Sequence, residues 1–279
     1  MKKIIERSLR LQRSFHGRGF SSIDLRAGIL NINPYLILTE FNMSQPFFPP
    51  HPHAGVSVAT YIFPDSAGGF INRDSRGDHS RIEPGGLHLT QAGVGMQHEE
   101  VPEKNGLNVH GMQIWINHSA ENRLSEAKAY HAASAEIPEV TTEAATIRVV
   151  FGEYAGEKSP IVPLTRVSLL DVYVKPNGTE TIQLPDNELF VGFVLDGDGV
   201  LNNAKIGSIE GLELSASGSE ITLQAGGSGL HLLLSAGEEI NEPIVYGGPF
   251  VMNTSEQLLE TKRRFARGEM GELAPSVAF

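Results

Sequence analysis

Turn-forming residues divide this chain into many short segments. The sequence contains 30 glycines and 16 prolines among 279 residues, and the stretches between them are short and often alternate between apolar and polar side chains. Many short segments of this kind, separated by turns, favour a β-sandwich or barrel over alternating strands and helices. The segments with the length and composition of β-strands are Val58–Phe63, Leu87–Gln91, Met112–Asn117, Ile147–Phe151, Val167–Val174, Phe190–Leu195 and Leu230–Leu234. The sequence therefore predicts an all-β fold.

One helix is predicted near the C-terminus. Asn253 is a suitable N-cap, Glu256 lies three residues later as in a capping box, and Gly268 is suited to end the helix. The basic run Lys262–Arg264 then lies on the solvated face of this helix, next to acidic residues.

A change in composition divides the chain into two halves. The segment Ser134–Ala145 is polar, contains Pro138 and has no hydrophobic periodicity, as is typical of a linker. We therefore expect an N-terminal domain of residues 1–137 and a C-terminal domain of residues 138–279 that ends in the helix, each of ordinary size. Nine of the ten histidines precede residue 135. A metal site, if there is one, is expected in the N-terminal domain, and none in the C-terminal domain.

Composition excludes several classes of function. The chain has no cysteine, which excludes a disulfide scaffold, a thiolate zinc site and a cysteine nucleophile. Its formal net charge of −11 repels phosphate backbones, so direct binding to nucleic acid is not expected. No apolar run reaches the length of about 18 residues that crosses a membrane, and the basic N-terminus lacks the apolar core of a secretory signal. We expect a cytoplasmic protein that does not bind membranes.

Four candidate metal ligands lie in two short segments of the first half. His51 and His53 are two residues apart, so on an extended backbone their imidazoles project from the same face. The same spacing pairs His98 with Glu100 and turns Glu99 away. If the two segments lie side by side in one small barrel, three imidazoles and one carboxylate converge, a set that suits a first-row divalent metal. Four protein ligands on an octahedral ion would leave two positions open, unlike a closed structural zinc site.

Other residues compete with this set. His88 lies on a predicted strand and could face the barrel interior, although a partly buried polar residue near the barrel mouth is the favoured interpretation. His79 lies in a charged segment and is expected to be solvated. His110 and His118 flank a predicted strand and are expected at the surface or behind the ligands. Glu99 could replace Glu100 only if the local backbone is not extended.

Four motifs in this chain carry a family resemblance. They read HPHAG at residues 51–55, PG at 84–85 followed by AGVGMQHEEVP at 92–102, GMQIWIN at 111–117, and GPFVMNT at 248–254. In this combination and order the sequence resembles the pirin family, a branch of the cupin superfamily. The collinear resemblance extends from about Asn33 to Gly268.

The resemblance implies a bicupin, with two face-to-face β-barrels of the jelly-roll type and a metal in the N-terminal barrel alone. It implies one divalent transition metal, most commonly Fe(II), with Mn, Co, Ni, Cu or Zn as alternatives. It also implies that the C-terminal barrel fills its interior with apolar side chains such as Leu232 and Leu234. The ligands that the resemblance assigns are His51, His53, His98 and Glu100.

The chain departs from the family pattern directly after the first motif. Family members commonly have Arg-Gly-Phe-Glu there, whereas this chain has Ala54, Gly55, Val56 and Ser57. Ser57 lacks the carboxylate that many cupins use as a ligand, so the carboxylate must come from Glu100. Ala54 is expected to change charge and volume near the entrance of the site, so the substrate of other members is not carried over.

The resemblance implies two kinds of function. The first is a metal-dependent dioxygenase that acts on a flavonol such as quercetin or on a related small aromatic substrate. In that enzyme Glu100 is a ligand and the nearest candidate base, and Phe47, Phe48 and Val56 are expected to form an apolar wall. The alternative is a non-enzymatic, metal-dependent regulator that binds a transcription factor or a metabolic enzyme, and the acidic net charge suits a protein partner better than DNA. A metal retained for stability alone is a third, less favoured, interpretation.

Overall fold

A computed structural model describes residues 1–186 and 188–277 of the chain. Most of this part consists of β-strands, and all seven predicted strand segments lie in or overlap observed strands. The only α-helix in the described residues is α1 (Ser255–Ala266), and no helix there is long and apolar enough to cross a membrane. The all-β prediction is therefore confirmed.

The predicted helix cap is wrong by one residue. Thr254 is the N-cap, and its side chain accepts a hydrogen bond from the backbone N–H of Gln257. Asn253 does not cap the helix because its side chain is used elsewhere: its oxygen accepts a hydrogen bond from Arg123 Nε at 3.0 Å. Gly268 follows the helix with a positive φ of 76°, as expected of a residue that ends a helix.

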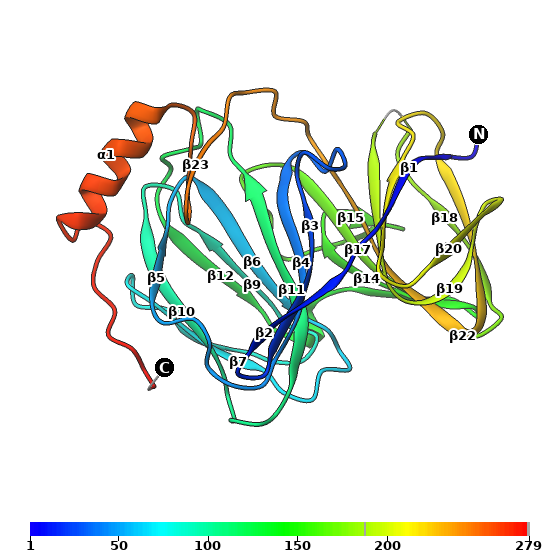
Figure 1. The fold of residues 1–279 in the computed structure, drawn as a ribbon. Coiled ribbons are helices and arrows are strands. Elements are labelled where there is room, and N and C mark those ends of the chain that lie inside the picture. The colour runs from blue at the N-terminus through cyan, green and yellow to red at the C-terminus, as the bar shows by residue number, and fades with distance from the viewer. Residues whose placement is uncertain (187, 278–279) are drawn as a thin grey trace.

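The N-terminal half forms two facing sheets (Figure 1). The larger sheet has seven strands in the order β12 (Lys128–Ala132), β9 (Leu87–Gln91), β6 (Val56–Ile62), β11 (Val109–Asn117), β4 (Tyr35–Met43), β3 (Phe20–Arg26) and β2 (Arg13–Gly17). The smaller sheet has four strands in the order β5 (His51–His53), β10 (Met96–Pro102), β7 (Phe70–Asp74) and β8 (His79–Ile82). Every neighbouring pair is antiparallel.

The C-terminal half forms one nine-stranded sheet. Its main path is β1 (Ile5–Arg10), β21 (Glu210–Leu214), β19 (Phe190–Leu201), β22 (Glu220–Gly237), β17 (Val167–Val174), β14 (Ala145–Phe151) and β13 (Glu139–Thr141), while β18 (Thr179–Gln183) pairs with β22 and β20 (Ala204–Gly207) with β19. The interior is apolar, and Leu232 and Leu234 are both fully buried in it, as predicted. The remaining elements are a 3-10 turn at Ser134–Glu136 and two hairpins, β15 (Glu153–Tyr154) with β16 (Glu157–Lys158) and β23 (Val245–Gly247) with β24 (Phe250–Met252).

One hydrophobic cluster spans the two barrels. Tyr35 and Phe63 of the first half pack in the same buried cluster as Leu169 and Phe193 of the second. Hydrogen bonds cross this boundary as well. Tyr35 donates to the Ser168 carbonyl at 2.6 Å. Because the shared surface is large and apolar, the barrels are expected to behave as one folding unit.

Both ends of the chain cross between the barrels. Strand β1, from the N-terminus, pairs with β21 at the edge of the C-terminal sheet, and the buried Lys3 ammonium donates to three backbone carbonyls there. The C-terminal segment returns to the N-terminal barrel, where Val251 N–H donates to the Ala54 carbonyl at 3.0 Å. Figure 1 shows α1 next to β23, and the helix packs on the β23–β24 hairpin. The division into domains of residues 1–137 and 138–279 remains a prediction. Each end of the chain packs on the barrel formed mainly by the other half.

Candidate metal centre

Three imidazoles converge on the inner face of β5 and β10. The two strands pair antiparallel with His98 directly opposite His51, and the two-residue spacing puts His53 on the same face as His51. The ligand nitrogens of the three side chains lie within 4.8 Å of one another. Within residues 1–186 and 188–277, no other group of three or more His, Asp or Glu side chains has this arrangement. The predicted side-by-side placement of the two segments is confirmed.

The hydrogen bond of His51 leaves one of its ring nitrogens available for a metal. His51 Nδ1 lies 2.9 Å from the Pro49 carbonyl, which can only accept, so Nδ1 carries the proton and Nε2 has a free lone pair. His51 Nε2 and His98 Nε2 face each other at 3.2 Å. Such facing nitrogens are the arrangement that an ion between the rings requires. The residues present therefore fit a metal.

Burial keeps these imidazoles neutral, which is the form that binds metals. Burial, reinforced by the neighbouring imidazoles, lowers the pKa of His53 and of His98 well below the usual 6.5. Burial also lowers the pKa of His51, although the Pro49 carbonyl opposes the shift.

Glu100 faces the same interior, two residues beyond His98 on β10. Its side chain is buried, and the Thr60 hydroxyl donates a hydrogen bond of 2.8 Å to its Oε2. Burial raises the pKa of Glu100 to about 7, against the opposing effect of the Thr60 hydrogen bond. Its carboxylate is not among the atoms that gather within 4.8 Å, so it lies beside the three histidines and not between them. Glu99 points the other way and pairs with Arg73 at 2.7 Å, as strand alternation predicts.

The competing histidines lie outside this cluster. His88 is fully buried on β9 and its Nδ1 is 3.4 Å from Ser80 Oγ, while burial lowers its pKa to about 4. His79 is exposed, although it lies on β8 and not in a loop. Neither belongs to the group of converging ligand atoms.

His110 and His118 have separate polar partners. His110 Nε2 lies 2.8 Å from the buried Glu40 carboxylate, on the side of the barrel that faces the C-terminal half. His118 is fully buried, so of the two predicted locations, at the surface or behind the ligands, the surface is excluded. Its Nε2 is 2.8 Å from Ser57 Oγ, and burial lowers its pKa to about 4.

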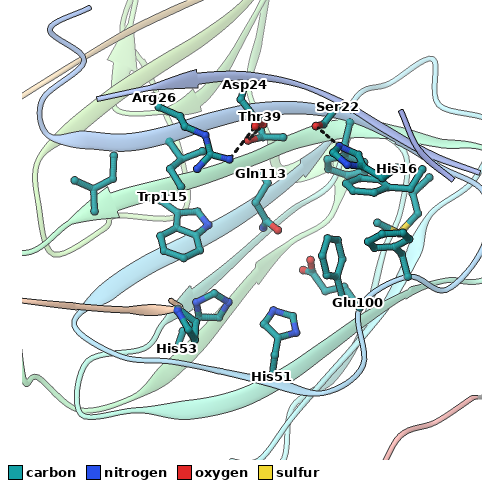
Figure 2. Close-up of a pocket in the computed structure, with 18 of the residues that line it drawn as sticks. His16, Ser22, Asp24, Arg26, Thr39, His51, His53, Glu100, Gln113 and Trp115 are labelled. Atoms are coloured by element: carbon teal, nitrogen blue, oxygen red, sulfur yellow. Dashed lines mark hydrogen bonds and ion pairs between the residues drawn. The ribbon is translucent and has the colours of Figure 1, made fainter. Parts of the chain in front are cut away.

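A pocket of about 850 Å³ opens onto the candidate ligands. His51, His53 and Glu100 lie along one side of it, and Arg26, Asp24 and Thr39 lie along the opposite side (Figure 2). The aromatic residues that line it are Phe20, Phe41, Phe47, Phe48, Phe70, Trp115 and Tyr246. A planar aromatic molecule therefore fits both the size and the chemistry of this pocket.

The structure places two predicted wall residues correctly and one wrongly. Phe47 and Phe48 line the pocket, as expected. Val56 does not, because it is fully buried in a cluster with Leu36, Val58 and Val251.

Ala54 itself does not line the pocket. Its side chain is fully buried in a cluster with Phe250, Met252 and Leu258 and is not among the residues that line the pocket. The effect of replacing the family's arginine at this position stays a prediction.

Sequence reasoning missed several pocket residues. Trp115 packs edge-on against His53 with ring centroids 5.0 Å apart, and Gln113, two residues earlier on β11, donates to the Thr60 hydroxyl at 2.9 Å. Both face the pocket (Figure 2). The signal that could have found them is their two-residue spacing on a predicted strand, which puts their side chains on one face.

Comparison with known proteins identifies the family. The family model described as Pirin matches residues 30–116, and the model described as the Pirin C-terminal cupin domain matches residues 169–271. The chain belongs to the pirin family. Pirin-1 of Arabidopsis thaliana is 32% identical to it over 248 residues, which cover 86% of this chain and 83% of the relative. Pirin of Homo sapiens is 28% identical over 251 residues, which cover 88% and 86%.

Solved structures share the fold of this pirin. A quercetin 2,3-dioxygenase from Acinetobacter baumannii has a TM-score of 0.87 and 25% identity, with 98% of this chain and 99% of that chain covered. The bacterial pirin YhhW from Escherichia coli, solved in complex with nickel(II), has a TM-score of 0.63 and 16% identity, with 82% and 96% covered. At that identity, the second match shows the fold alone. The bicupin fold expected from the sequence is thereby confirmed.

Proposed function

We propose that this pirin is a metal-dependent dioxygenase that acts on a flavonol such as quercetin or on a related small aromatic compound. The observation that carries the proposal is the position of three converging imidazoles at one side of an aromatic-lined pocket of about 850 Å³. The likeness to a quercetin 2,3-dioxygenase over nearly the whole chain supports it. The reaction opens the oxygen-containing ring of the flavonol with O₂ and releases carbon monoxide.

We propose His51, His53 and His98 as metal ligands and Glu100 as the fourth. One divalent ion, Fe(II) first and Mn, Co, Ni, Cu or Zn as alternatives, suits imidazole and carboxylate donors. When bound, the ion would supply Lewis acidity that favours the ionised form of a phenol. The Nδ1 bond of His51 to Pro49 fixes the ring so that Nε2 points inward.

The side chains around the candidate ligands supply the rest of the site. Glu100 is the carboxylate on the same face of β10 as His98 and it lines the pocket, so it is the proposed base as well as a ligand. Thr60 orients the Glu100 carboxylate through its hydroxyl. Phe47, Phe48 and Trp115 offer apolar surfaces to an aromatic ring and exclude water from it.

Anaerobic reconstitution tests this function. The purified protein is loaded separately with Fe(II), Mn(II), Co(II), Ni(II), Cu(II) or Zn(II), and quercetin loss and carbon monoxide release are measured after O₂ is admitted. We expect turnover with at least one metal and its loss in His53→Ala. The matched control is His79→Ala, which removes an exposed imidazole outside the site. Stoichiometric metal binding without turnover for any metal would refute the enzymatic proposal.

That same result would favour a regulatory role. In this second candidate function, the metal state of the centre would be read by a cytoplasmic protein partner such as a transcription factor or a metabolic enzyme. The formal net charge of −11 favours a protein partner with a basic surface. Phe48, which is 41% exposed at the pocket edge, would lie in the contact.

A further inference from the structure

Residues 270–276 run along the outside of the strand that carries His98. We call these residues the strap. Ser75 Oγ donates to the Met270 carbonyl at 2.6 Å, and Gln97 donates to the Gly271 carbonyl at 2.5 Å. Met270 is fully buried against Gly95, where a Cβ atom would meet it at 2.7 Å. The strap is therefore packed tightly against the turn at which β10 begins.

The end of the strap binds an ion pair on the outer face of β10. The Ser276 N–H lies 3.1 Å from both oxygens of the Glu99 carboxylate. Arg73, from the neighbouring strand β7, donates to Glu99 at 2.7 Å and to the Ala274 carbonyl at 2.7 Å. Only 1% of Glu99 is exposed. Its charge thus depends on Arg73 and on the strap for hydrogen bonds that water would otherwise supply.

Strand β5, which carries His51 and His53, has little other support within its sheet. Strand β5 is a three-residue edge strand, and its one partner within the sheet is β10. Such short pairing alone is marginal. The C-terminal segment adds contacts at both strands: Val251 donates to the Ala54 carbonyl directly after β5, and Arg264 donates to the Val94 carbonyl before β10 at 2.9 Å.

We propose that Glu99 and the strap are positioning elements of the metal centre. They act through β10. The hydrogen bonds of Arg73 and Ser276 to Glu99 hold the backbone between His98 and Glu100, so that His98 stays opposite His51. Glu99 touches neither the metal nor the substrate. The inference rests on the proposed metal centre and adds that its geometry is maintained by a segment whose Ser276 lies 177 residues after Glu99 in the sequence.

Two variants of the full-length protein separate the positioning role of the strap from an effect of the Glu99 charge. Glu99→Gln keeps the shape of the side chain and removes its charge. Because that charge also acts on His51, the decisive variant is Ser276→Pro, which deletes the N–H donor and leaves β10 and every charge unchanged. The control is Glu272→Gln, an exposed position in the same segment.

The probe is Co(II) alone. Its dissociation constant is measured by competition with a chelator, and its visible absorption spectrum reports the ligand geometry. We expect Ser276→Pro and Glu99→Gln to weaken Co(II) binding by about 10-fold or more, as is usual when groups behind the ligands are lost, and to change the spectrum. Amide hydrogen exchange should accelerate in residues 96–102 and stay unchanged in residues 167–174, which shows that the fold is intact.

The possible results are distinct. Affinity within about two-fold of wild type in Ser276→Pro, against the roughly 10- to 100-fold effect usual for lost outer-shell groups, would overturn the positioning role, even if exchange in β10 rises. An equal loss of affinity in Glu272→Gln would also overturn it, because the effect would then not depend on the contact with Glu99. Wild-type protein that binds no Co(II) would instead refute the proposed metal centre, and the inference with it.

Discussion

Replacing Thr60 with valine isolates one hydrogen bond at the candidate metal centre. Valine has nearly the same shape but cannot donate to Glu100 Oε2, which lies 2.8 Å from the threonine hydroxyl. A hydrogen bond to a charged group contributes about 1.5–3 kcal/mol, and about 1.4 kcal/mol corresponds to one pKa unit. The pKa of Glu100, about 7 in the wild type, should therefore rise by about one to two units in the variant.

The rise has a direct effect on metal binding. At pH 7 the ionised fraction of Glu100 should fall from about one half to roughly 1–10%. If the ionised carboxylate is a ligand, metal affinity at pH 7 should fall about 5- to 50-fold. The loss should diminish as the pH is raised towards about 9, where Glu100 ionises in the variant as well.

The assay is chelator competition with Mn(II) or Co(II) at a series of pH values. The matched control is Thr39→Val, because Thr39 lines the same pocket but donates to Asp24 and not to Glu100. Equal affinities of Thr60→Val and wild type at pH 7 would show that the ionisation of Glu100 does not govern metal binding, and would remove Glu100 from the proposed ligand set.

Three further predictions concern the ligands and the contact between the barrels. A His53→Ala and Glu100→Ala double variant should bind no metal by elemental analysis, and one ion per chain would contradict the site. Tyr61→Phe removes a buried 2.8 Å hydrogen bond to Asp171 and should lower the free energy of unfolding in urea by about 1.5–3 kcal/mol; no loss would contradict this. Burial lowers the pKa of His231, but Asp171, 2.6 Å away, outweighs it and raises the pKa. This pair therefore stabilises the fold fully below the unfolded-state pKa of about 6.5, and its stabilisation is lost as pH rises through the folded-state value. The stability difference between wild type and His231→Gln should shrink from about pH 6 to about pH 9, and a constant difference would refute the assignment.

The part of the candidate site that could be predicted from the sequence is the local part. Side chains two residues apart on a strand share a face whatever the rest of the fold, so the pairing of His51 with His53 and of His98 with Glu100 needed only the correct strand assignment. The outward direction of Glu99 followed from the same alternation. The register that sets His98 opposite His51 required the structure, because it depends on long-range pairing.

Other expectations failed where both faces of an element are buried. All seven residues of β6 are buried, so its sequence carries no alternation to show which face meets the pocket. For this reason Val56 was wrongly placed in the pocket wall and Thr60 was missed. Likewise, nothing local indicates that Ala54 packs beneath Phe250, nearly 200 residues later.

The exchange of chain ends between the barrels has a consequence for any attempt to cut the protein in two. A fragment of residues 1–137 would carry β1 away from its partner β21, and a fragment of residues 138–279 would carry α1 and the strap away from β5 and β10. Each fragment would expose a bare strand edge and an uncovered apolar surface, features that favour aggregation. When the two fragments are mixed, each supplies the strand or segment that the other lacks. We therefore expect that neither fragment folds stably alone and that the two associate into the native fold.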